Sequence, residues 1–163
     1  MEGMDIFRGL ALAFAVSAVL APVAHVLEMP NKLQLDGPLW LAIQQNLYRG
    51  WGPFIGAPTE LGALALSVIA CWWYGKDRRA RWLWLSAAGA YAGMLILFFV
   101  FNAPVNAAVT GWRSDTLPAD WMWFRARWEL GHCLAAILSG GGLFATLKAS
   151  RHDLADTLSG GTV

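Results

Sequence analysis

Four long apolar stretches, which carry almost no charge, constrain this chain most. The first runs from Gly9 to Leu27, 19 residues without a formal charge. As a helix it would span about 28 Å, close to the hydrocarbon thickness of a bilayer. Three more follow, over residues 58–75, 82–103 and 129–148. This pattern predicts four membrane-spanning helices.

The composition agrees with a membrane protein. Hydrophobic residues make up 57% of the 163 residues and charged residues only 14%. The ten tryptophans suit membrane interfaces, where an apolar ring carries one polar N–H. The net charge of +1 gives no reason to expect a nucleic-acid partner. Cys71 and Cys133 form no spaced motif, so we expect free thiols.

The predicted fold class is all-α, an integral membrane four-helix bundle formed by one domain over residues 1–150. Its helices are expected at about 6–28, 58–75, 82–103 and 129–148. Two longer, Trp-rich loops would lie on the outer side, and the first would carry a short interfacial helix. Residues 151–163 are expected to form a polar C-terminal tail, partly disordered.

The orientation follows from a short basic turn over residues 76–81, in which four of six residues are Lys or Arg. Short loops rich in these residues stay in the cytoplasm. With four crossings, both termini would then be cytoplasmic, in an inner or plasma membrane.

Polar residues interrupt or flank the apolar stretches in a regular way. His25 and Glu28 end the first, Glu60 begins the second, and Glu129 and His132 begin the fourth. Because successive helices alternate in direction, all five fall at one depth near the outer face. Ionisable groups in a bilayer are costly, so they usually face the bundle interior.

This set predicts a site with divided roles. His25, Glu60 and His132 are the candidate catalytic residues, and no cofactor-binding motif is present. The same three, with Glu28 and Glu129, could hold one or two divalent ions of iron, manganese, copper or zinc. Three asparagines could support these ligands by hydrogen bonding: Asn31, Asn102 and Asn106.

A simpler interpretation stays open for each residue. Glu28 and Glu129 could be ordinary interfacial carboxylates that pair with Lys32, Arg125 or Arg127. Glu60 could lie near a helix N-terminus, where the helix dipole favours an anion.

Three segments carry a family resemblance: AHVLEMPNK at 24–32, NAPVN at 102–106 and RWELGH at 127–132. Together they resemble the anthrone-oxygenase-like family of small four-helix membrane proteins. The resemblance implies oxygen insertion into an aromatic polyketide anthrone, which gives a quinone. It implies no particular catalytic residue, so the site prediction rests on the bundle.

The leading functional hypothesis is a membrane oxidoreductase or oxygenase that acts on a lipophilic phenol, anthrone or quinone. Without a metal, the histidines and carboxylates would act as base and acid. One alternative is a haem-binding electron carrier with His25 and His132 as axial ligands. Another is a non-enzymatic assembly or interaction protein, and a transporter is a further one. Candidate partners are membrane lipid, a hydrophobic small molecule and further copies of the chain, with no nucleic acid.

Overall fold

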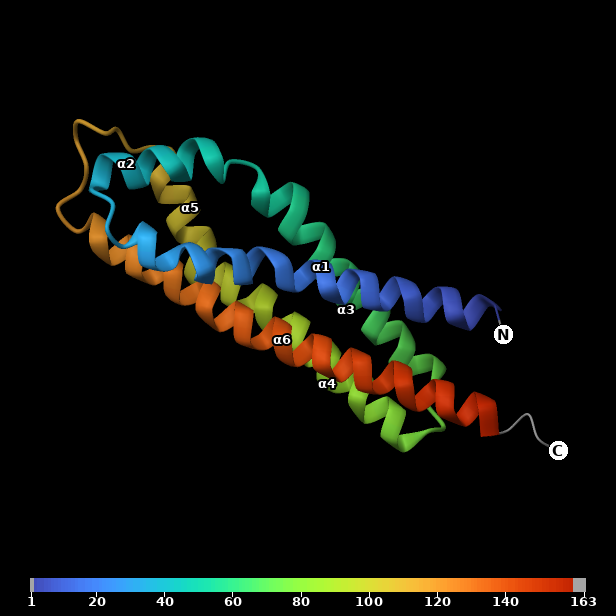
Figure 1. Ribbon diagram of the computed structural model, residues 1–163. Coiled ribbons are helices and arrows are strands. Elements are labelled where there is room, and N and C mark those ends of the chain that lie inside the picture. Colours follow the sequence, from blue (N-terminus) through green and yellow to red (C-terminus); the bar gives the residue numbers. More distant parts are fainter. Residues whose placement is uncertain (1, 160–163) are drawn as a thin grey trace.

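The computed structural model describes the backbone of residues 2–159 and the side chains of residues 3–152. This part of the chain is all-α and contains no strand, as predicted. Four long helices dominate it in Figure 1: α1 (Glu2–Lys32), α3 (Ala57–Trp73), α4 (Arg78–Leu97) and α6 (Trp121–Ser159).

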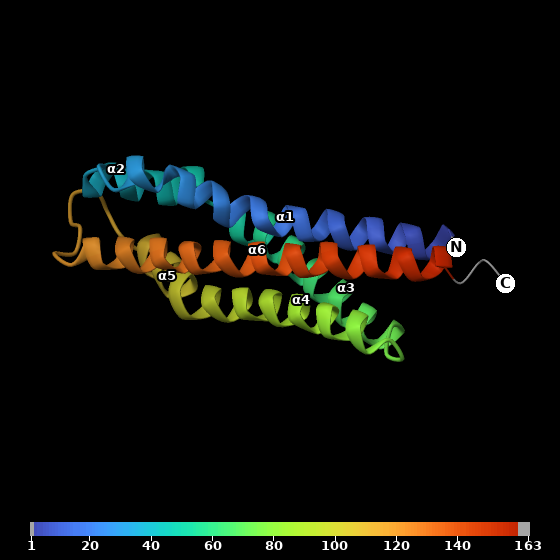
Figure 2. The same cartoon turned by 60° about the horizontal axis from the view of Figure 1, so that its bottom comes forward.

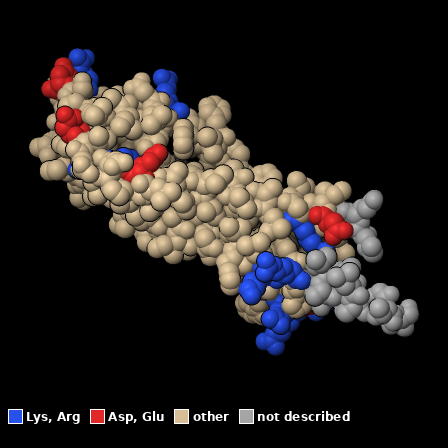
Figure 3. All heavy atoms as spheres, in the orientation of Figure 1, with Lys and Arg blue, Asp and Glu red and all other residues tan. Residues whose placement is uncertain are grey.

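Four helical stretches are long and apolar enough to cross a membrane. Only 17% to 33% of the residues in their apolar windows are buried inside the bundle. Most of the apolar surface therefore faces outward, which is typical of helices that contact lipid. Figure 3 shows the complementary pattern on one face, where the charged side chains gather near the two ends and leave the middle bare.

The long helices form a closed arrangement of neighbours. α6 packs along α1 and α4, and α3 packs along the same two helices. In Figures 1 and 2, α6 lies beside α1 in both views, and α1 begins at the same end of the bundle where α6 ends. We call this the terminal end. The opposite one, which carries residues 33–56 and 111–120, is the loop end.

The helices are longer than their apolar stretches. α6 begins at Trp121 rather than near residue 129 and continues to Ser159, through much of the predicted tail. α1 likewise reaches Lys32. Charge marks where an apolar stretch ends, but Lys and Arg are good helix formers, so the helices continue. Residues 160–163 of the predicted tail lie outside the described residues.

Short helices fill the loop end. The predicted interfacial helix is α2 (Gly37–Ala42), capped by Asp36, whose side chain accepts from the Leu39 N–H at 2.9 Å. Two π-helical turns follow: η1 (Ile43–Leu47) and η2 (Gly52–Gly56).

The third predicted helix does not end at residue 103 but continues past Pro104. A π-helical turn, η3 (Phe98–Asn102), leads into α5 (Ala103–Thr110), where Pro104 occupies the first turn. Because η3 runs directly into α5, Pro104 has no N–H to donate to the carbonyl of Val100, and the helical hydrogen bonding is interrupted at that point.

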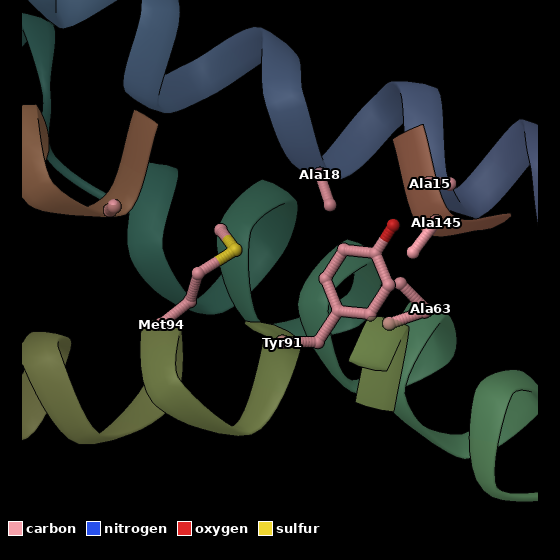
Figure 4. Packing of buried hydrophobic residues seen from close by; sticks show 8 residues of the cluster. Ala15, Ala18, Ala63, Tyr91, Met94 and Ala145 are labelled. Atoms are coloured by element: carbon pink, nitrogen blue, oxygen red, sulfur yellow. The ribbon is translucent and has the colours of Figure 1, made fainter. Parts of the chain in front are cut away.

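Small residues form the middle of the bundle. Figure 4 shows Tyr91 and Met94 of α4 among Ala15, Ala18 and the alanines of α3 and α6. Alanine side chains let the helix backbones approach closely, as in many membrane bundles. The Tyr91 hydroxyl lies 3.4 Å from the Thr146 hydroxyl, which gives the buried phenol a partner.

Candidate functional site

A polar cluster lies at the loop end of the bundle, where the last turns of α1 face the first turns of α6. His25, Glu28 and Lys32 follow one another at spacings of three and four, so they share one face of α1. Glu129 and His132 share one face of α6 in the same way. With two aromatic neighbours they form what we call the His–Glu–Lys cluster: His25, Glu28, Lys32, Tyr48, Trp128, Glu129 and His132.

Lys32 joins the two helices electrostatically. Its ammonium lies 3.1 Å from Glu129 Oε2 and 3.9 Å from Glu28 Oε2. The side chains of Lys32 and Glu129 are each only 4% exposed, and the ammonium also lies 4.8 Å from the centre of the Trp128 ring. A buried charge requires such pairing. Lys32 is therefore the cation of this site, whereas the sequence had indicated only an interfacial pair with Glu28 or Glu129.

The two histidines are in direct ring contact. The ring centroids of His25 and His132 lie 4.1 Å apart, and both rings pack against Trp128, at 4.8 Å and 4.2 Å. His25 is buried, with Nδ1 3.6 Å from Glu28 Oε2. The structure therefore brings the two predicted imidazoles into contact.

Hydrogen bonds from η3 and α5 fix Trp128. Its indole N–H donates to Asn106 Oδ1 at 2.9 Å, and its backbone carbonyl accepts from Asn102 Nδ2 at 2.9 Å. Asn102 is buried directly against Gly131, where an added Cβ would lie 2.3 Å from Asn102 Oδ1. Both asparagines therefore support the cluster through Trp128.

Tyr48 closes the cluster from the loop. Its hydroxyl donates to Glu28, and its ring stacks on Trp128 with centroids 5.6 Å apart. Burial, followed by the hydrogen bond to the Glu28 carboxylate, raises the pKa of Tyr48 above its ordinary value of 10.0. The phenol stays protonated at neutral pH and remains a donor.

Arg125 fixes the end of α1 over the cluster. Its guanidinium donates to the carbonyls of Lys32 at 3.3 Å and Leu35 at 2.9 Å. The last carbonyls of a helix lack intrahelical donors, so a buried arginine there satisfies them. Arg125 thereby holds the backbone that carries Lys32.

Two predicted residues do not join the cluster. Glu60 is half-buried in the first turn of α3, and within the described part of the chain it makes no hydrogen bond or ion pair. Asn31 is exposed, and its side chain makes no hydrogen bond to any described residue. Alternation of helix direction fixed the depth of Glu60, but not the face of α3 that carries it.

The predicted metal ligands do not assemble into a chelating set. Across residues 3–152, no three His, Cys, Asp or Glu side chains are arranged so that they could hold a metal ion. Lys32 supplies positive charge between Glu28 and Glu129 instead. The two imidazole centroids, 4.1 Å apart, also leave no room for a haem plane between them. Metal and haem binding stay predictions that this geometry does not favour.

Two buried atoms of the cluster lack a hydrogen-bond partner in the described part of the chain, His25 Nδ1 and Glu129 Oε1. Leaving a buried polar atom unpaired costs about 1–3 kcal/mol. Each such group requires an explanation, and a bound polar ligand is one. Glu28 connects the buried cluster to the protein surface, since its side chain is 43% exposed.

One of the missed residues had a signal in the sequence. Lys32 lies seven positions after His25, on the same helical face. Tyr48 carries no comparable signal, because its position depends on the fold of the loop between α2 and α3.

Comparisons of the chain with models of protein families, with curated proteins and with solved structures each find no match. The resemblance to the anthrone-oxygenase-like family stays a prediction.

Proposed function

We propose that this protein is a membrane-embedded oxidoreductase that deprotonates a lipophilic phenol, anthrone or related aromatic at the His–Glu–Lys cluster and exposes it to dioxygen. The four apolar helices support access from lipid. The orientation with cytoplasmic termini, in an inner or plasma membrane, belongs to the same proposal and rests on the basic turn at 76–81.

The observation that carries the proposal is the pair of contacting imidazoles beside unpaired buried atoms. His25 and His132 come from two different helices, yet their rings touch within a buried aromatic and charged environment. Neither His25 Nδ1, which lies 3.6 Å from Glu28 Oε2, nor Glu129 Oε1 has a hydrogen-bond partner among the described residues. A hydroxyl group of a substrate could donate to one of these atoms and accept from a nearby donor.

The chemistry required is proton removal followed by oxidation. An imidazole is a suitable base near neutral pH, and such a base contributes typically about 10²–10⁴-fold to rate. The Lys32 ammonium lies within the same cluster, 3.1 Å from Glu129 Oε2. Its positive charge could also stabilise an oxyanion that develops on the substrate. For an anthrone, the ring CH₂ becomes C=O, with one dioxygen consumed and one water released.

The test uses the purified protein in detergent micelles with a lipophilic anthrone under air. Oxygen uptake and the quinone absorption band are followed together. We expect turnover by the natural protein and a loss of about 10²-fold or more in His132→Ala. His152→Ala is the matched control, because the third histidine lies in the last turns of α6 and contacts Asp77 at 3.3 Å. It should keep full activity.

Elemental analysis and a chelator separate this proposal from a metal enzyme. Activity that survives the chelator in metal-free protein supports proton chemistry by the side chains. If removing a stoichiometric metal abolishes the activity, the proposed mechanism would be overturned, but the assignment as an oxidoreductase would stand. No oxygen uptake with phenolic or anthrone substrates would overturn the proposed function itself.

A further inference from the structure

Two open hollows, which together we call the groove, lie along the seam between α6 and the continuous helix formed by α4 and η3. One hollow, of ≈ 390 Å³, lies between Gly93 and Ile137, and a second, of ≈ 320 Å³, lies between Phe101 and Arg127. Along α6 the lining residues recur every three or four positions, so they occupy one face. The two hollows therefore follow one another along the same seam.

The groove differs in character along its length. The hollow near the middle of the bundle is lined by apolar residues alone. At the loop end, Arg127 is the single charged residue of the second hollow. From Arg127 to Ile137 the helix rises about 15 Å, half of the ~30 Å hydrocarbon thickness. The groove thus matches one leaflet, with a cation at its polar end.

The position of Arg127 is fixed by a backbone requirement. Pro104 has no N–H to donate to the carbonyl of Val100, four residues earlier. Arg127 Nη2 donates to that carbonyl instead, and the guanidinium also lies 5.2 Å from the centre of the Trp123 ring. This uses one of five N–H donors. No carboxylate pairs with Arg127 in the described part of the chain.

We infer that this groove binds an anionic phospholipid, with its phosphate at Arg127 and one acyl chain along the seam between α4 and α6. An arginine held by packing presents a planar fork that matches phosphate oxygens. Trp123 beside it suits the level of the lipid headgroups. The inference uses the membrane placement of the proposed function and not its chemistry, so the two can fail separately.

The test measures lipid binding rather than activity. Detergent-solubilised protein is titrated with phosphatidylglycerol, or with phosphatidylcholine of the same acyl chains, and bound lipid is counted by native mass spectrometry. We expect the natural protein to prefer phosphatidylglycerol by about tenfold, because both lipids offer a phosphate to Arg127 but only in phosphatidylglycerol is its charge not balanced by a choline cation. Equal binding of the two lipids would overturn the inference.

Three variants locate the binding. Arg127→Gln should remove the preference, and Arg127→Lys should keep part of it. Arg113→Gln is the matched control, since that side chain is 76% exposed and pairs with Asp115. It should bind as the natural protein does, and an equal loss there would indicate general charge attraction and overturn the site.

A further variant covers the case in which Arg127→Gln destabilises the fold. Ala126→Phe fills the second hollow but leaves the guanidinium and its bond to Val100 in place. It should lower binding of both lipids while circular dichroism stays unchanged. Unchanged binding in this folded variant would also overturn the inference.

Discussion

The middle and the loop end of the bundle join the same two helices by different means. In the middle, α1 and α6 meet through alanines such as Ala15, Ala18 and Ala145, whose contacts require only small size. At the loop end they meet through the Lys32–Glu129 ion pair and the contact between His25 and His132.

The difference lies in what each contact demands. Packing between small residues depends only on how closely the helices approach. The dispersion energy is nearly the same for any two small side chains that fit. A buried ion pair depends on both partners, because each charge without the other is costly. The loop end therefore gains little net stability from its ion pairs, although removing one partner of a pair is costly.

The largest expected effect is on the ion pair. Lys32→Met should destabilise the protein by about 3–5 kcal/mol, because it leaves Glu129 buried and unpaired. Unfolding in mixed micelles with increasing SDS, followed by circular dichroism, measures the change. The double variant Lys32→Met/Glu129→Gln should recover much of the loss. A single-variant cost below about 1 kcal/mol, the scale of a surface pair, would contradict a buried interaction.

The next largest effect is the loss of stability when glycines of α6 are replaced by alanine, which should differ with their position. Gly131→Ala should cost about 2–4 kcal/mol, since the new Cβ would lie 2.3 Å from Asn102 Oδ1 and displace the bond to Trp128. In the middle, Gly142→Ala should cost less, because the three atoms nearest to its Cβ all belong to the far end of the Tyr91 side chain, the closest at 2.8 Å. Gly140→Ala has nothing within 4 Å and is the control.

Gly140→Ala should be neutral or stabilising by about 0.5–1 kcal/mol, as expected for replacing glycine in a helix. The same SDS titration compares all three variants. Equal losses in Gly131→Ala and Gly142→Ala would mean that the loop end is no more demanding than the alanine core.

A smaller effect is expected at Asn106. Asn106→Ala removes the acceptor of the Trp128 indole N–H and should cost about 1–2 kcal/mol. The stronger consequence should be a looser Trp128, visible as a lower activity in the anthrone assay. Unchanged activity in a folded variant would show that Trp128 is held by its ring contacts alone.

The sequence predicted much of this loop end because helix direction is a topological property. Apolar stretches located four helices, and their alternation placed His25, Glu28, Glu129 and His132 at one depth. It could not predict which side of α3 carries Glu60, since that depends on how the helices rotate when they pack.

The sequence also could not predict the role of the loop. Tyr48 reaches Glu28 only because residues 33–56 fold back over the bundle through α2 and two π-helical turns. These turns have no simple sequence period. Lys32 was visible at helical spacing, but the expected helix ended before it.

The smallest expected effect is a pH dependence of stability, which arises at Tyr48 in the loop and not in the alanine core. The folded protein raises the pKa of Tyr48, so its phenol favours folding while it is protonated. This contribution is present in full below the ordinary phenol pKa of 10.0 and is lost as pH rises through the higher folded value. Stability should therefore fall with rising pH above about 10, and less steeply in Tyr48→Phe.

Absorbance at 295 nm measures the ionisation of Tyr48 directly. At pH 11 the folded natural protein and Tyr48→Phe should show the same tyrosinate signal, because Tyr48 does not ionise. After unfolding, the natural protein should show one tyrosinate more. A difference of one tyrosinate already present in the folded proteins would mean that Tyr48 ionises as an exposed residue does, and that its bond to Glu28 does not hold the loop on the cluster.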